Sequence, residues 1–191
     1  MTTASSKHPT AAADRPGAGR TMPMTEVGNL SAPAANARRL FQAIGRNRRL
    51  PRFTPLFELS APDQIAIIRD GISPDALKTM IQAMELSQEK VFDYLALSAA
   101  TINRKIKREE RLSPDESARV LGLASLIGQV QAMVERSGDP EGFDAAKWVA
   151  EWIERPLPAL GGEKPAAYLD TTTGQQMVAD LLAKMESGAY A

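Results

Sequence analysis

The sequence predicts an all-α protein, and three observations lead to this fold class. Serine and threonine residues that can cap a helix recur along the chain from Ser60 onward. Apolar residues follow them at spacings of three and four, the period of a helix with one buried face. No segment has the alternating apolar and polar pattern of a half-buried strand. We therefore expect helices throughout the folded part of the chain.

The composition is that of an ordinary soluble protein, and it excludes several kinds of site. The 191 residues are 43% hydrophobic and 24% charged, with no cysteine and one histidine, His8. Disulfides, thiolate catalysis, histidine-based triads and Cys- or His-rich metal sites are therefore excluded, and no cofactor is expected. No segment approaches the roughly 20 consecutive apolar residues of a membrane span, and the N-terminus lacks an apolar signal core. We expect a cytoplasmic protein with no membrane partner.

The two ends of the chain differ in charge. Residues 1–52 hold nine basic and two acidic side chains, and prolines interrupt a stretch rich in alanine, threonine and glycine. This segment cannot bury enough apolar surface to offset its ordering entropy, so a basic, disordered arm is predicted. The arm, with a short helix near residues 37–44, could bind a polyanion, or it could be a solvated or processed leader. Residues 139–191 hold nine acidic and four basic side chains, which suggests a different partner.

Four short helices are predicted between residues 60 and 108, each beginning after a serine. The capping residues are Ser60, Ser73, Ser87 and Ser98. Gly71 can end the first helix in a left-handed conformation. The apolar residues carried by these helices are Ile65, Ile68, Leu77, Met80, Ile81, Met84, Val91, Phe92, Leu95, Ile102 and Ile106.

The longest predicted helix begins at a capping box formed by Ser113 and Glu116. Its apolar face is unusually wide, because further apolar residues flank the main stripe. The helix therefore needs more than one packing surface. It is either a central core helix, which is the commoner arrangement, or it also contacts a second subunit. The apolar residues are Val120, Leu121, Leu123, Leu126, Ile127, Val130, Met133 and Val134.

Two more helices are predicted after a break at residues 138–140. The first covers residues 143–154 and places Trp148 and Trp152 one turn apart, most simply in the core, with a partner-facing edge as the alternative. Prolines and glycines between residues 156 and 165 predict a rigid loop. The last helix is expected from about Thr172, with Gln175 completing a capping box, to Ser187.

The helices near residues 88–95 and 99–108 have the spacing of a helix-turn-helix, with the small Ala96 in the turn. The second helix carries polar and basic residues suited to a major groove, where Asn pairs with adenine, Arg with guanine, and Lys with phosphate. A structural hairpin with a charged outer face is the alternative. The candidate DNA-binding residues are Ala100, Asn103, Arg104 and Lys107 on one face, with Thr101, Lys105 and Arg108 beside them.

Two stretches resemble known families. The segment Ser98-Ala-Ala-Thr-Ile-Asn-Arg-Lys-Ile-Lys resembles the recognition helices of the Cro/repressor class. The C-terminal segments Trp148-Val-Ala-Glu-Trp152, Pro156-Leu-Pro-Ala-Leu-Gly-Gly-Glu-Lys-Pro165 and Leu169-Asp-Thr-Thr-Thr-Gly174, with Gly188-Ala-Tyr-Ala191, resemble the Xre/MbcA/ParS toxin-binding domain. The resemblance covers about residues 60–191.

This resemblance implies the antitoxin of a type II toxin–antitoxin pair. It implies a Cro/repressor-like helix-turn-helix region for DNA binding and dimerisation over residues 60–136, and a helical toxin-binding region over residues 139–191. The usual partner is a RES-domain toxin that depletes NAD⁺. The antitoxin is expected to occlude the toxin's active site and, as a homodimer on operator DNA, to repress its own operon. The candidate toxin-binding residues are Trp148, Trp152, Leu160, Gly161, Gly162, Met185, Gly188, Tyr190 and Ala191.

Two other functions compete with this interpretation. A stand-alone repressor would use the C-terminal region only to dimerise or to bind a signal, and a neighbouring toxin gene or a co-purifying protein would distinguish it. An enzyme is the weaker competitor, because helix capping accounts for most of the carboxylates noted and no phosphate-binding loop or metal-ligand set is present in the sequence.

Overall fold

Serine side chains begin most of the helices, as the sequence predicts. The computed structural model describes residues 1–2, 52–138 and 140–188, and the described part is helical with no strand. The all-α prediction is thus confirmed, whereas nearly all of the predicted arm lies outside the described residues. The helices are α2 (Thr54–Phe57), α3 (Ala61–Asp70), α4 (Pro74–Met84), α5 (Gln88–Tyr94), α6 (Ala99–Arg108), α7 (Pro114–Ser137), α8 (Ala145–Trp152) and α9 (Thr172–Glu186), with 3₁₀ turns η1 (Pro158–Leu160) and η2 (Pro165–Tyr168).

Each predicted serine cap accepts a backbone N–H from the first turn of its helix, which satisfies a donor that has no partner within the helix. The caps are Ser60 for α3, Ser73 for α4, Ser87 for α5, Ser98 for α6 and Ser113 for α7. At α7 the reciprocal bond from the Ser113 backbone N–H to the Glu116 carboxylate, at 2.6 Å, completes the predicted capping box.

The start of α9 differs from the prediction. Thr171 is the capping residue, and its hydroxyl accepts the N–H of Gly174 at 3.1 Å. Gln175 forms no capping box, because its side chain is buried between α7 and α9. There its amide nitrogen donates to the carbonyl oxygens of Arg119 and Leu169, both at 2.9 Å. Satisfying these carbonyls inside the protein is the role that Gln175 takes instead.

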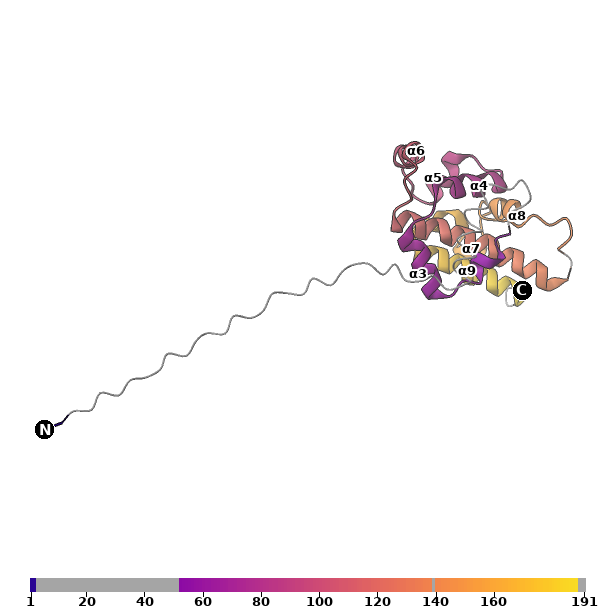
Figure 1. Ribbon diagram of the computed structural model, residues 1–191. Helices are drawn as coiled ribbons and strands as arrows, with labels where there is room; N and C mark the ends of the chain where they lie inside the picture. Colours follow the sequence, from indigo (N-terminus) through magenta and orange to yellow (C-terminus); the bar gives the residue numbers. More distant parts are fainter. Residues whose placement is uncertain (3–51, 139, 189–191) are drawn as a thin grey trace.

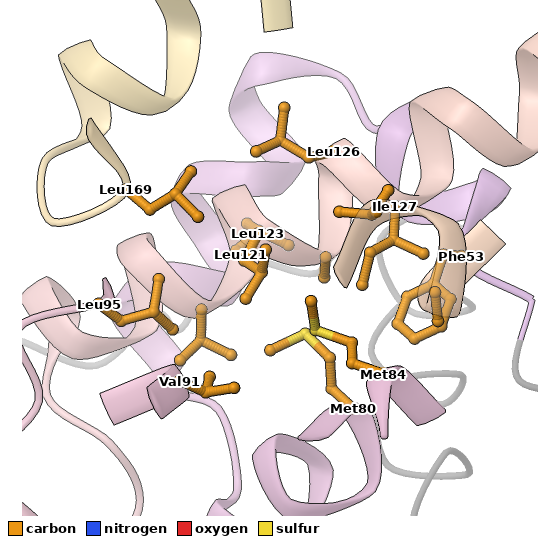
Figure 2. Packing of buried hydrophobic residues seen from close by; sticks show 14 of the residues in the cluster. Phe53, Met80, Met84, Val91, Leu95, Leu121, Leu123, Leu126, Ile127 and Leu169 are labelled. Atoms are coloured by element: carbon orange, nitrogen blue, oxygen red, sulfur yellow. The ribbon is translucent and has the colours of Figure 1, made fainter. Parts of the chain in front are cut away.

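Helix α7 runs through the centre of the molecule, with α2, α3, α8 and α9 packed around it (Figure 1). Its wide apolar face is therefore that of a core helix. Side chains from α4, α5 and the C-terminal region converge on its middle, where Leu123 and Ile127 are fully buried (Figure 2). Helix α7 is long and apolar enough to cross a membrane by length and composition alone, but 61% of its apolar window is buried inside the protein.

A short helix that the sequence did not predict crosses α7. Phe53 and the residues of α2 lie on α7 at Gly128, where an added Cβ would stand 2.3 Å from the carbonyl oxygen of Phe53. The backbone N–H of Phe53 donates to the side chain of Gln131 at 2.8 Å, and Arg52 forms a 3.0 Å ion pair with Glu135. We refer to residues 53–57 as the strap. The first backbone N–H groups of the strap are capped by the side chain of Gln131 on α7. Because Gln131 is distant in sequence, no local signal predicts the strap.

The helix-turn-helix region and the C-terminal region share one hydrophobic core. Helix α4 packs on α8, and α7 packs on both α8 and α9. Buried residues from both regions, such as Met84 and Leu182, belong to the same cluster. The two regions are therefore parts of a single folded unit.

Candidate functional site

The helix-turn-helix is formed by α5, a tight turn and α6. Ala96 adopts a positive φ of 46° in the turn, a conformation that a bulky or β-branched side chain would strain. The N–H of Leu97 donates to the carbonyl of Phe92 at 2.8 Å, which closes the turn. Leu95 and Ile102 are fully buried and join the two helices. The small residue in the turn and the apolar seam agree with the predicted motif.

The outward face of α6 is polar and basic. Asn103 and Arg104 are exposed near its middle, and Lys107 and Arg108 are exposed near its end. Ala100 is also exposed, and Thr101 is partly exposed. The helix lies at the edge of the molecule, away from α9 (Figure 1). Such a face can enter a major groove, with Asn and Arg at base edges and Lys at phosphates.

Lys105, predicted beside this face as a DNA-binding residue, is buried instead. Lys105 is only 9% exposed, and its ammonium forms a 2.5 Å ion pair with the carboxylate of Glu116 at the start of α7. Burial raises the pKa of Glu116, but the hydrogen bonds from Lys105 and Ser113 together with the Lys105 charge outweigh burial, so the net pKa lies below its usual value. Helical spacing places Lys105 three residues after Ile102, on the buried side of α6, so the burial agrees with its position in the helix and not with its residue type.

The two tryptophans of α8 have different surroundings. Trp152 is 4% exposed and belongs to the core, which agrees with the core prediction, and its burial leaves little of the ring accessible for the toxin contact also predicted for it. Trp148 is only partly buried and stacks on Trp152, with ring centroids 5.8 Å apart and planes 12° apart. Phe143 contacts the other side of Trp148, at a centroid distance of 6.5 Å. Trp148 and Phe143, both partly buried, are thus the parts of this aromatic group that a partner can reach.

The segment after α8 forms a tight turn on the surface. Gly161 and Gly162 have positive φ values of 66° and 91°, both are exposed, and nothing lies within 4 Å of a Cβ added at either. The glycines are therefore required by the turn itself. Leu160 is partly buried against the core, and the N–H of Gly162 donates to the carbonyl of Leu157 at 3.0 Å. The turn presents the backbone of Gly161 and Gly162 to solvent.

The last predicted toxin-binding residues lie at or beyond the end of α9. Met185 is 38% exposed in its final turn, and Gly188 is exposed with φ 68° just after it. Tyr190 and Ala191 lie outside the described residues.

An ion-pair link between the two regions has no counterpart in the sequence prediction. Glu154, after α8, accepts from Lys164 at 3.1 Å and from Lys90 of α5 at 3.2 Å. The hydrogen bond from Lys164 is the main reason that the Glu154 pKa is lowered; partial burial opposes it, and Lys90 adds to the lowering. Lys90 lies 64 residues from Glu154 and Lys164 lies 10 residues from it, so no helical or strand spacing could reveal their contact. The link joins the DNA-binding motif to the loop that carries Gly162.

Comparison with known proteins places both regions in families. Residues 63–125 match the family described as "Antitoxin Xre-like helix-turn-helix domain", and residues 141–188 match "Antitoxin Xre/MbcA/ParS C-terminal toxin-binding domain". The chain is 45% identical over 139 residues to the "Prs ADP-ribosylating antitoxin" of Sphingobium sp. (strain YBL2), covering 73% of this chain and 87% of that protein. The chain belongs to the Xre/MbcA/ParS family of antitoxins.

A second antitoxin relative is more distant. The "Antitoxin Xre" of Yersinia enterocolitica serotype O:8 / biotype 1B (strain NCTC 13174 / 8081) is 25% identical over 123 residues, covering 64% of this chain and 78% of that protein. The family consists of antitoxins with helix-turn-helix and toxin-binding domains, not of enzymes. In this antitoxin the toxin-binding match contains α8, both 3₁₀ turns and α9, and it implies a toxin as partner.

Proposed function

We propose that this antitoxin inhibits a RES-domain toxin that consumes NAD⁺, by covering the toxin's active site. The observation that carries the proposal is the 45% identity to a relative whose name includes "Prs ADP-ribosylating". ADP-ribosyl transfer breaks the bond between nicotinamide and ribose, as does NAD⁺ depletion by hydrolysis. The two reactions differ in the acceptor, which is a protein in the first and water in the second. We expect the toxin of this pair to catalyse one of them in the cytoplasm.

The docking surface is proposed to be the outer edge of Trp148, the turn at Gly161 and Gly162, and the end of α9 at Met185. These residues are partly or fully exposed, and α8 and α9 are held rigidly on α7, so docking would order few groups. Residues 189–191 are proposed to extend from this surface into the substrate cleft, with Tyr190 as the inserted ring.

The test co-expresses the antitoxin with its toxin and follows nicotinamide release by the purified complex. Removing residues 189–191 should leave co-purification intact and restore nicotinamide release, and Tyr190→Ala should restore it in part. Met185→Asp is the matched variant on the docking surface, and it should weaken co-purification and inhibition together. Full inhibition by the shortened protein would contradict insertion of the tail. Labelled NAD⁺ then shows whether ADP-ribose ends on a protein or free in solution.

We further propose that a homodimer of the antitoxin binds its operator through α6 and represses its own operon, since paired helix-turn-helix units read two half-sites. Asn103→Ala and Arg104→Ala should each relax base preference at a cost of about 1–3 kcal/mol. Lys107→Ala should weaken binding to all sequences and reduce its salt dependence. Equal losses on preferred and random DNA for all three variants would contradict this choice of reading residues.

A further inference from the structure

The recognition helix α6 has few anchors to the rest of the molecule. Within the described residues its main packing partner among the helices is α4, and Ile102 is the apolar residue that it buries completely. Its link to α7 is the ion pair between Lys105 and Glu116, whose side chains are 11% and 13% exposed. The orientation of α6 therefore depends on a small number of contacts, and this pair is shorter than the other ion pair of the helix, Arg108–Glu110 at 3.6 Å.

The capping box of α7 holds the Glu116 carboxylate in place independently of Lys105. This carboxylate accepts the backbone N–H of Ser113 at 2.6 Å in the capping box of α7, and the Ser113 hydroxyl accepts the N–H of Glu116 in return. The same oxygen of Glu116 accepts from the Lys105 ammonium at 2.5 Å. A carboxylate held by the helix cap thus gives α6 a defined point of attachment.

A second contact from α7 reaches the turn that precedes α6. Arg119, one turn after Glu116, donates to the carbonyl oxygen of Ala96 at 3.4 Å. That bond is long, and the buried Nε of the same guanidinium has no hydrogen-bond partner within the described part of the chain. The first turns of α7 therefore hold the helix-turn-helix at two places, and the contact at Lys105 is the shorter one.

We propose that Lys105 and Glu116 are positioning residues that set the orientation of α6 for reading bases, an inference that rests on the proposed DNA-binding function. A charge-assisted hydrogen bond fixes direction as well as distance. The hydrophobic contact of Ile102 carries no direction of its own, whereas base-edge hydrogen bonds weaken when their angle changes. Buried ion pairs contribute little net stability, so specific orientation is the better account of this one.

The test compares Lys105→Met with Lys107→Met, the same change at an exposed lysine two residues further along α6. The probes are a duplex selected by the wild-type protein from a randomised library and a random-sequence duplex, with binding followed by fluorescence anisotropy at several salt concentrations. Lys105→Met should bind the selected duplex about tenfold more weakly and the random duplex unchanged, with the same salt dependence. Lys107→Met should weaken both and lower the slope against log salt by about one.

A third variant tests whether the two residues act as a unit. Lys105→Met combined with Glu116→Gln should lose no more specific affinity than Lys105→Met alone, because the interaction is already absent. This double variant also leaves no unpaired buried carboxylate, so it replaces Lys105→Met if circular dichroism shows that the single variant does not fold.

Three outcomes would overturn the inference. An equal loss on both duplexes with a smaller salt slope would make Lys105 a phosphate contact. An unchanged sequence preference in Lys105→Met, or in the double variant, would show that the pair positions nothing. If the wild-type protein selects no sequence, DNA reading itself fails and the positioning role fails with it, a result distinct from the other two.

Discussion

Replacing Gly128 with alanine separates two opposing effects on stability. Alanine is favoured over glycine by about 1 kcal/mol in the interior of a helix, so sequence alone predicts that the variant is more stable. The strap opposes this gain, because the new Cβ would lie 2.3 Å from the carbonyl oxygen and 2.8 Å from the carbonyl carbon of Phe53, and 3.0 Å from the Cβ of Phe57. Two of these atoms belong to the backbone and cannot turn away, so the strap must move.

The cost of that movement exceeds the gain. Phe53 is 1% exposed and Leu56 is 0% exposed, and forcing extra atoms into such a tightly packed contact costs typically 1–3 kcal/mol. A shift of the strap also strains the 2.8 Å hydrogen bond from the Phe53 N–H to Gln131. After the helix gain is subtracted, we expect Gly128→Ala to lower the free energy of unfolding by up to about 2 kcal/mol.

The assay is urea unfolding followed by circular dichroism at the helix band. Ala118→Gly in the same helix is the control, since Ala118 is only partly buried and its replacement should cost about 1 kcal/mol, mainly from the helix preference of alanine. If Gly128→Ala is instead stabilised by as much as Ala118→Gly is destabilised, the strap does not lie against the α7 backbone and the reasoning is wrong.

Three further predictions concern the core and its polar contacts. Trp152→Ala should lower the unfolding free energy by roughly 3–5 kcal/mol. Trp148→Ala should lower it less and should also weaken co-purification with the toxin. Equal losses of stability for the two variants in urea titrations would contradict the difference in burial. Gln175→Leu should cost about 1–3 kcal/mol by the same assay, because two carbonyls lose their buried partner; an unchanged midpoint would refute that role. The Glu116 pKa is lowered from its ordinary value of 4.5, so the stabilisation by its carboxylate is present above that pH and is lost as pH falls through the folded-state pKa. Unfolding midpoints in acid should therefore fall less in Glu116→Gln. Parallel curves would show that the contacts of this carboxylate with Lys105 and Ser113 contribute no pH-dependent stability.

The sequence predicts those structural features that depend on residues close together in the chain. Helix starts depend on a serine and the N–H three residues later, so the caps from Ser60 to Ser113 could be recognised without any tertiary contact. The strap could not, because its capping partner Gln131 lies 78 residues from Phe53. The same limit applies to Gln175. Its spacing from Thr172 predicts a capping box, but its side chain donates to the carbonyls of Arg119 and Leu169, and the Arg119 carbonyl is brought near only by the packing of α9 on α7.

The residues of the candidate sites also divide into those whose exposure follows from one helix and those whose contacts depend on the tertiary fold. Exposure of Asn103, Arg104 and Lys107 follows from helical periodicity, which depends on α6 alone. The same spacing places Lys105 on the buried side with Ile102, but its ion-pair partner Glu116 could not be identified from α6 alone, because that partner lies at the start of α7. The links from Glu154 to Lys90 and Lys164 likewise appear only when three distant segments meet.

The single core shared by the helix-turn-helix and the toxin-binding region restricts how such a protein can change partners in evolution. Proteins whose regions are separate domains can exchange them by recombination at a linker, but a cut between α7 and α8 would expose buried faces of α4, α7, α8 and α9 on both fragments. An incoming half would have to reproduce those faces as well as recognise a new toxin. New pairings in this lineage are therefore expected to arise by successive substitutions at exposed positions of the toxin-binding region such as Met185, with the buried faces shared with the helix-turn-helix inherited unchanged.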